Sequence, residues 1–188
     1  MTDEAINKVE ITYDGAVSKM NINALTASAV AGMIKSQVSE VNMVSAPVMA
    51  KERGIQISET VQDKSGVFDS YIKIRIVTEK QERSVAGTVF SDGKPRFIQI
   101  KGINLDAEIG RYMIYTTNAD VPGIIGTLGT VFGEAGVNIA NFQLGRNKPG
   151  GDAIALLYID QPADQAALKQ LLDSGLFQQA RPLEFDVA

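Results

Sequence analysis

One loop in this sequence carries groups suited to binding a small charged molecule. It reads Asn118-Ala119-Asp120-Val121-Pro122-Gly123 and precedes an apolar segment with helical spacing. Free N–H groups at a helix N-terminus attract a carboxylate. The amides of Gly123 and Ile124 can therefore hold the carboxylate of a zwitterionic amino acid. The side chain of Asp120 or Asn118 can then balance the ammonium group.

The same loop also has a purely structural interpretation. Asp120 can accept backbone N–H bonds as a helix N-cap, and Pro122 fits a first helical turn because its missing donor costs nothing there. A capped helix start needs no ligand. The loop by itself therefore leaves both interpretations open.

Two absences limit the chemistry that this chain can perform. There is no Cys, which excludes thiolate nucleophiles, disulfides and the usual structural zinc sites. There is no His, the commonest general base near neutral pH and the commonest metal ligand. Gly123, Gly126 and Gly129 form GxxGxxG instead of the dinucleotide fingerprint GxGxxG. We expect no catalytic residue, no metal and no NAD site in this chain.

Composition describes an ordinary globular protein. The chain has 188 residues, 45% of them hydrophobic, enough for one large domain or two small ones. A net charge of −4 argues against nucleic acid as the main partner. No run approaches the roughly 18 apolar residues of a membrane span, and Met1–Glu10 is not a secretory signal. The lack of Cys and of a signal fits a reducing cytoplasm.

The second part of the chain shows a regular alternation of elements. Its pattern predicts strand, helix, strand, strand, helix and strand, which is the ferredoxin-like βαββαβ arrangement. The predicted elements are Tyr112–Thr117, the amphipathic helix Gly123–Ala135, Ile139–Leu144, the central strand Ala153–Ile159, a helix that begins near Pro162, and Pro182–Val187.

The first part predicts a small mixed domain, so that the whole chain belongs to the α+β class. Asp14-Gly15 indicates a hairpin turn between strands Val9–Tyr13 and Ala16–Met20. Two helices, four further strands and a loop around Gly102 follow, with the strands mostly sequential and therefore largely antiparallel. The helices are Asn23–Val38 and Ala46–Arg53, and the strands are Gln56–Val61, Tyr71–Val77, Ser84–Phe90 and Arg96–Ile100. Glycine becomes frequent from Gly110 onward, which places the domain boundary between residues 1–109 and 110–188.

Several motifs together resemble the C-terminal regulatory region of D-3-phosphoglycerate dehydrogenases. The loop 118–123, Gly136-Val137-Asn138-Ile139 and Gln143-Leu144-Gly145-Arg146 are similar to the ACT domain of that family. Upstream motifs resemble the family's intervening, or allosteric substrate-binding, domain, and the two domains come in the family's order. These motifs are Val41-Asn42, Ala46-Pro47, Ala50-Lys51-Glu52-Arg53-Gly54 and Gly87-Thr88-Val89.

The resemblance implies a regulatory role. The family enzyme oxidises D-3-phosphoglycerate with NAD at the first step of serine synthesis, so the partners expected here are L-serine, a second copy of the chain and the parent's catalytic domain. The family's effector site lies between two ACT domains. The resemblance assigns it Asn118, Asp120, Pro122, Gly123 and Ile124 of one chain, and Asn138 with Ile139 of the other.

An anion site in the first domain is a second expectation from the resemblance. Arg96 stands where some family members carry a basic residue, with Lys94 and Lys101 nearby. Three other positions argue against an anion site, because they are basic or His in those members and are Ile103, Asn104 and Glu108 here. The alternative is a solvated strand edge with scattered charges.

Three rival functions remain open from the residues. A constitutive dimerisation module would have the same fold without a ligand. A stand-alone enzyme would need a carboxylate–lysine site, which the sequence does not display. The beta chain of bacterial L-serine dehydratase also joins a related domain to an ACT domain, but its Ser/His-rich substrate motif is missing here.

Overall fold

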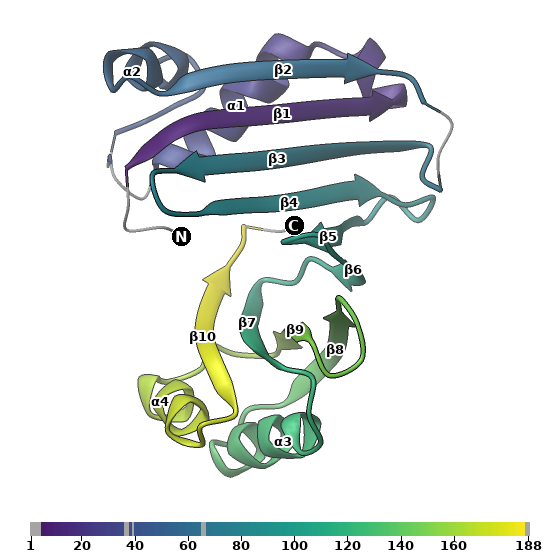
Figure 1. Cartoon of the computed structure of the whole chain (residues 1–188), viewed down its shortest axis with the longest axis vertical. Coiled ribbons are helices and arrows are strands. Elements are labelled where there is room, and N and C mark those ends of the chain that lie inside the picture. The colour runs from purple at the N-terminus through teal and green to yellow at the C-terminus, as the bar shows by residue number, and fades with distance from the viewer. Residues whose placement is uncertain (1–4, 36–37, 39, 65–66, 187–188) are drawn as a thin grey trace. The chain divides into compact units, whose positions relative to one another are not determined.

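A computed structural model describes residues 5–35, 38, 40–64 and 67–186 of the chain. It divides into two compact units, Met1–Val89 and Phe90–Ala188 (Figure 1). The α+β class is confirmed, since each unit combines a β-sheet with two α-helices. Parts of two predicted elements, residues 36–37 and 187, lie outside the described residues.

The first unit is a sheet with helices on one face. Its strands are β1 (Ile6–Gly15), β2 (Gln56–Gln62), β3 (Ser70–Thr78) and β4 (Glu82–Val89), and its helices are α1 (Ile22–Ile34) and α2 (Ala46–Glu52). The strand order is β2-β1-β3-β4. Alternate residues of β1 (Val9, Ile11 and Tyr13) form a core with the helices. The opposite face of β1 carries ion pairs, such as Glu10 with Arg75 at 2.5 Å.

One connection differs from the largely antiparallel prediction. β1 pairs with β2 in parallel, whereas β1–β3 and β3–β4 are antiparallel. A parallel pair needs a long crossover, and α1 and α2 provide it.

The predicted hairpin at Asp14-Gly15 is wrong. Gly15 (φ 76°) ends β1, and a 3-10 helix, Ala16–Lys19, follows instead of a strand. The backbone donors after the turn reach a different segment: Ala16 N–H donates to the carbonyl of Asp69 at 3.1 Å. A Cβ on Gly15 would lie 2.1 Å from that same carbonyl oxygen, so glycine is required there by close approach as well as by its φ.

The second unit contains the predicted ferredoxin-like arrangement. Its four-stranded antiparallel sheet has the order β10-β7-β9-β8, with β9 inside as expected. The elements are β7 (Tyr112–Ala119), α3 (Ile124–Glu134), β8 (Ile139–Arg146), β9 (Asp152–Ile159), α4 (Gln165–Asp173) and β10 (Phe177–Glu184). Leu128 and Phe132 of α3 and Leu171 of α4 are almost fully buried against one face of this sheet.

A hairpin covers the helix-free face of that sheet. Strands β5 (Pro95–Ile100) and β6 (Ile103–Glu108) form it, and β6 takes the place of the loop expected around Gly102. Ile103 and Ala107 pack with Met113 and Leu156 of the sheet. This packing joins the hairpin to the second unit, so the division between the compact units falls before the hairpin. The domain boundary at 109–110 stays a prediction.

Candidate functional site

The predicted effector loop forms at one end of the four-stranded sheet of the second unit, the predicted ACT domain, which is called the ACT sheet below. Asn118, at the end of β7, pairs with Ala153 of β9, and the loop then turns into α3. Gly123 caps the helix with φ 99°, in the left-handed region that glycine tolerates. Among the described residues, the N–H groups of Gly123 and Ile124 donate to no acceptor. They are the free helix-terminal donors that the sequence predicts.

Asp120 does not cap helix α3, so the structural interpretation of this residue is wrong. No side chain caps the helix. The Asp120 carboxylate accepts instead from the Gly150 N–H at 3.0 Å and from Arg146 Nη1 at 2.7 Å. The pKa of Asp120 lies below its ordinary value, mainly because of the Gly150 N–H and next because of the Arg146 guanidinium. A charged carboxylate is therefore present beside the loop, and Arg146 already neutralises part of its charge.

Asn118 contributes a second polar group, a buried side-chain amide. The residue is 1% exposed, and its Nδ2 donates to the Ala119 carbonyl at 2.7 Å. Its Oδ1 is buried and has no partner in the described part of the chain. A buried acceptor of this kind costs stability unless something bonds to it. The sequence singled out Asn118, but its lack of a partner is visible only in the fold.

Asn138 and Ile139 lie at the opposite end of the same sheet. Ile139 pairs with Ile159, which also pairs with Tyr112 at the start of β7, whereas the loop follows the end of β7. The seven residue steps between Tyr112 and Ala119 correspond to about 23 Å. One chain therefore cannot bring the Asn138 side chain to its own loop.

Asn138 already has a partner of its own. Its Nδ2 donates to Asp160 Oδ2 at 2.7 Å, and its side chain is exposed. This bond fixes the amide orientation at the surface. Binding to a ligand through Nδ2 would have to share or replace the Asp160 bond.

Exposed apolar side chains surround the loop. Val121 is 43% exposed and Ile125, on the first turn of α3, is 62% exposed. Both side chains lie close to the free N–H groups of Gly123 and Ile124 in the chain. The helical spacing of Ile124, Leu128, Val131 and Phe132 predicted a buried face that excludes Ile125, and the exposure of Ile125 agrees with it.

The basic residues of the predicted anion site lie within a set of carboxylates. Arg96 Nη2 is 2.5 Å from Asp92 Oδ2, and its other nitrogens lie 3.8 Å from Asp106 and 3.6 Å from Glu108. Lys94 Nζ is 2.7 Å from Glu108, and this contact raises the pKa of Lys94. An incoming anion would compete with three carboxylates. Lys101 lies apart from these pairs, in the turn between β5 and β6.

The described residues offer no sign of two other site types. They contain no group of three or more acidic side chains placed to hold a metal ion. None of their helices is long and apolar enough to cross a membrane.

The comparisons with known proteins assign the two parts of the chain. A family model described as "D-3-phosphoglycerate dehydrogenase intervening domain" matches residues 1–101, more than half of the chain. The chain belongs to this family. A second model, described as "ACT domain", matches residues 112–174 and so includes the loop, α3 and most of the ACT sheet.

Three curated relatives illustrate the similarity along most of the chain. D-3-phosphoglycerate dehydrogenase of Bacillus subtilis is 31% identical over 169 residues, and that of Archaeoglobus fulgidus is 32% identical over 170 residues. Each alignment covers 89% of this chain and 32% of the relative. The chloroplastic D-3-phosphoglycerate dehydrogenase 3 of Arabidopsis thaliana is 27% identical, with 89% and 31% covered. The chain thus spans about a third of the length of these relatives and matches their intervening and ACT regions.

Proposed function

We propose that this chain is the regulatory region of a cytoplasmic, NAD-dependent D-3-phosphoglycerate dehydrogenase of serine biosynthesis, and that two ACT domains bind L-serine between them. The separation of the two halves of the predicted site carries this proposal. The free N–H groups of Gly123 and Ile124 and the carboxylate of Asp120 lie at one end of the sheet, and Asn138 lies at the other. A second copy of the chain can supply the missing half.

The chemistry of the loop suits serine. The two free N–H groups and the positive end of α3 bind the ligand carboxylate. Asp120 attracts the ammonium group, and the Asn138 amide of the other chain binds the ammonium or the hydroxyl. The exposed Val121 and Ile125 become covered when the second chain docks.

A ligand-free dimerisation module is the second candidate, and two contacts favour it. Asp120 is bonded to Arg146 and Gly150, and Asn138 is bonded to Asp160. Both side chains are therefore satisfied without an amino acid. In that case the exposed apolar groups beside the loop serve association alone.

Calorimetric titration of the chain with L-serine separates the two candidates. The wild type should take up two serines per dimer, and Asn138→Ala should weaken binding by roughly ten- to a hundredfold, the usual loss for one charge-assisted contact. Asn141→Ala removes another exposed amide from β8 and should leave binding unchanged. If the wild type takes up no serine at millimolar concentration, the proposal of serine regulation fails. If the wild type is nevertheless a dimer under those conditions, the result supports the ligand-free dimerisation module.

A further inference from the structure

A hollow of about 290 Å³ lies within the second unit, on the helix-free face of the ACT sheet. The β5–β6 turn, Lys101-Gly102, forms one wall, and the ends of β7 and β9 form another. A space of this size holds several water molecules or one small metabolite. Asn118, the first residue of the effector loop, also lines it, whereas Asp120, Gly123, Ile124 and Asn138 do not.

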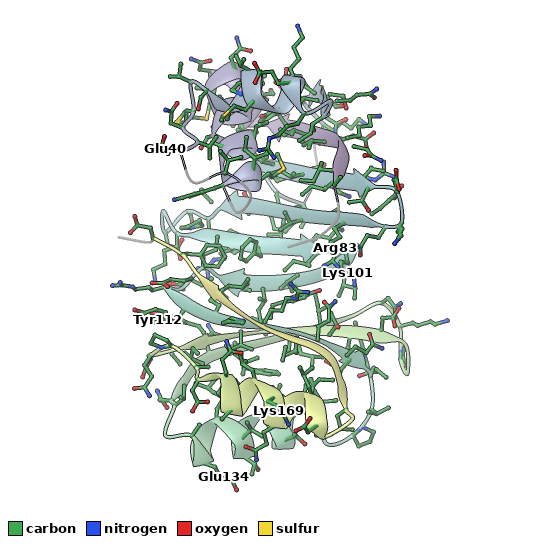
Figure 2. All side chains as sticks on the ribbon, turned by 90° about the vertical axis from the view of Figure 1, so that its left-hand side faces the viewer. Glu40, Arg83, Lys101, Tyr112, Glu134 and Lys169 are labelled. Carbon is green, nitrogen blue, oxygen red and sulfur yellow. The ribbon has the colours of Figure 1, made fainter. Side chains whose placement is uncertain are left out.

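Two opposite charges line this hollow, and neither is neutralised. Lys101 (labelled in Figure 2) and Asp152 are both exposed, and their side chains form no ion pair or hydrogen bond among the described residues. Asp152 lies on the same face of β9 as Ile154, because alternate residues of a strand share a face. Arg146 and Arg96 differ from these two groups, since Arg146 is bonded to Asp120 and Arg96 to Asp92.

The hydroxyl of a largely buried threonine adds a third polar group. Thr117 is 5% exposed, lines the hollow, and has no side-chain hydrogen bond within the described residues. Gln178 of β10 and Asn147 of the β8–β9 loop add amides to the wall. Ile103 and Ile154 supply its apolar part. Small-ligand sites combine an apolar wall with a few convergent polar groups in this way.

From this combination we propose that the hollow is an amino-acid site contained in one chain, and that of the residues assigned to the site between two chains it shares Asn118 alone. The ligand carboxylate meets the Lys101 ammonium, the ligand ammonium meets the Asp152 carboxylate, and Thr117 accepts or donates the remaining hydrogen bond. The volume limits the ligand to a small α-amino acid. An unpaired cation and an unpaired anion in one hollow favour a zwitterion over a simple anion, which would leave Asp152 unmatched.

Amide chemical shifts of the isotope-labelled chain, titrated with glycine, test the proposal. Saturable shifts are expected at Gly102, Ile103 and Ala153, with one glycine per chain. Acetate or methylammonium alone should not saturate these shifts. Acetate binding as tightly as glycine, or no saturation at these amides up to about 50 mM glycine, would overturn the proposal. Shifts at Gly123 and Ile124 report the site between two chains, so the two proposals can fail independently.

Two variants and their matched controls make the test specific. Lys101 has φ 51°, a left-handed conformation that Asn adopts more readily than Lys, so Lys101→Asn removes the charge and preserves the turn. Lys101→Asn and Asp152→Asn should each weaken glycine binding roughly tenfold or more. Lys148→Asn and Asp173→Asn remove one exposed charge each outside the hollow and should have no effect. If Lys101→Asn and Asp152→Asn both bind glycine with wild-type affinity, the proposed site is wrong.

Discussion

The two units differ in how they treat buried polar groups. In the first unit these groups are paired with one another. The hydroxyl of Tyr13, a fully buried residue, lies 2.7 Å from Thr26 Oγ1, and Thr26 donates to Glu59. Asp14, 4% exposed, accepts from Gln62 at 2.7 Å and from the Lys64 N–H at 2.9 Å. These bonds connect β1 to α1 and to the end of β2, so they specify packing.

The second unit leaves buried polar atoms without partners. Four such atoms occur in the described residues, and all belong to this unit: Arg96 Nε, Thr116 Oγ1, Asn118 Oδ1 and Gln179 Oε1. Three of them lie on the neighbouring strands β7 and β10. Unpaired buried groups reduce stability and persist where function or a partner requires them. The comparison shows that buried polar groups of the first unit specify its packing, whereas the second unit contains buried polar atoms that no packing contact satisfies.

The largest effect is expected from Thr26→Val in the first unit. The substitution keeps the shape of the side chain but leaves the buried Tyr13 hydroxyl without its partner. Such a loss costs about 1–3 kcal/mol of unfolding free energy. Urea denaturation and hydrogen exchange of the β1 amides measure this loss of unfolding free energy. Thr60→Val on the exposed side of β2 is the control and should change stability by less than about 0.5 kcal/mol. Equal effects of the two variants would contradict a structural role for the paired network.

A smaller effect on stability is expected when acid protonates the buried carboxylate of Asp14. The Lys64 N–H and the side chains of Tyr71 and Gln62 lower the pKa of Asp14 in the folded chain. A carboxyl whose folded pKa is depressed stabilises the fold above its unfolded pKa, and this contribution disappears as the pH falls through the folded pKa. The stability difference between wild type and Asp14→Asn should therefore shrink from pH 7 towards pH 2.

Denaturation of both proteins at a series of pH values measures this difference. Asp120→Asn should show the same sign, because Gly150 and Arg146 lower the pKa of Asp120 too, with a smaller change at its more exposed position. A difference for Asp14→Asn that is constant with pH would show that the carboxylate contributes nothing through its charge.

The smallest effect is expected from Thr116→Val in the second unit, the same substitution as in the first. Thr116 is fully buried and its hydroxyl has no partner in the described residues. Replacing it with a methyl group of the same shape removes an unpaired group, so stability should stay unchanged or rise by up to about 1 kcal/mol. Thermal unfolding monitored by circular dichroism measures the change. A loss above 1 kcal/mol would mean that the hydroxyl is satisfied in solution, and the contrast between the units would disappear.

Local patterns predicted most elements correctly. The apolar spacing of Leu128, Val131 and Phe132 indicated α3 and its buried face, and both were confirmed. The continuous apolar run in β9 indicated an inner strand, which the sheet order confirms. Strand β6 could have been found as well, because Ile103, Leu105 and Ala107 alternate with polar residues. Its shortness and the adjacent Gly102 made it resemble a loop.

The candidate sites were predictable only in part. The sequence indicated the loop at Asp120 because helix N-termini have a local signature. It could not predict that Arg146 and Gly150 hold Asp120, since residues 26 and 30 positions away reach it only through the β8–β9 hairpin. The same holds for Arg96, whose three carboxylate neighbours come from a turn and from β6.

The sequence by itself determined most of the elements, the ferredoxin-like order and the family resemblance, because periodicity, turn residues and short motifs are local properties. Tertiary structure decided which groups have partners. Asp14-Gly15 has the composition of a hairpin turn, but contacts with Asp69 and Lys64 made it a strand end. Lys101 and Asp152, 51 positions apart, line one hollow only because β6 packs across the sheet and places the β5–β6 turn beside the beginning of β9. Such pairings depend on contacts distant in sequence, and no local pattern encodes them.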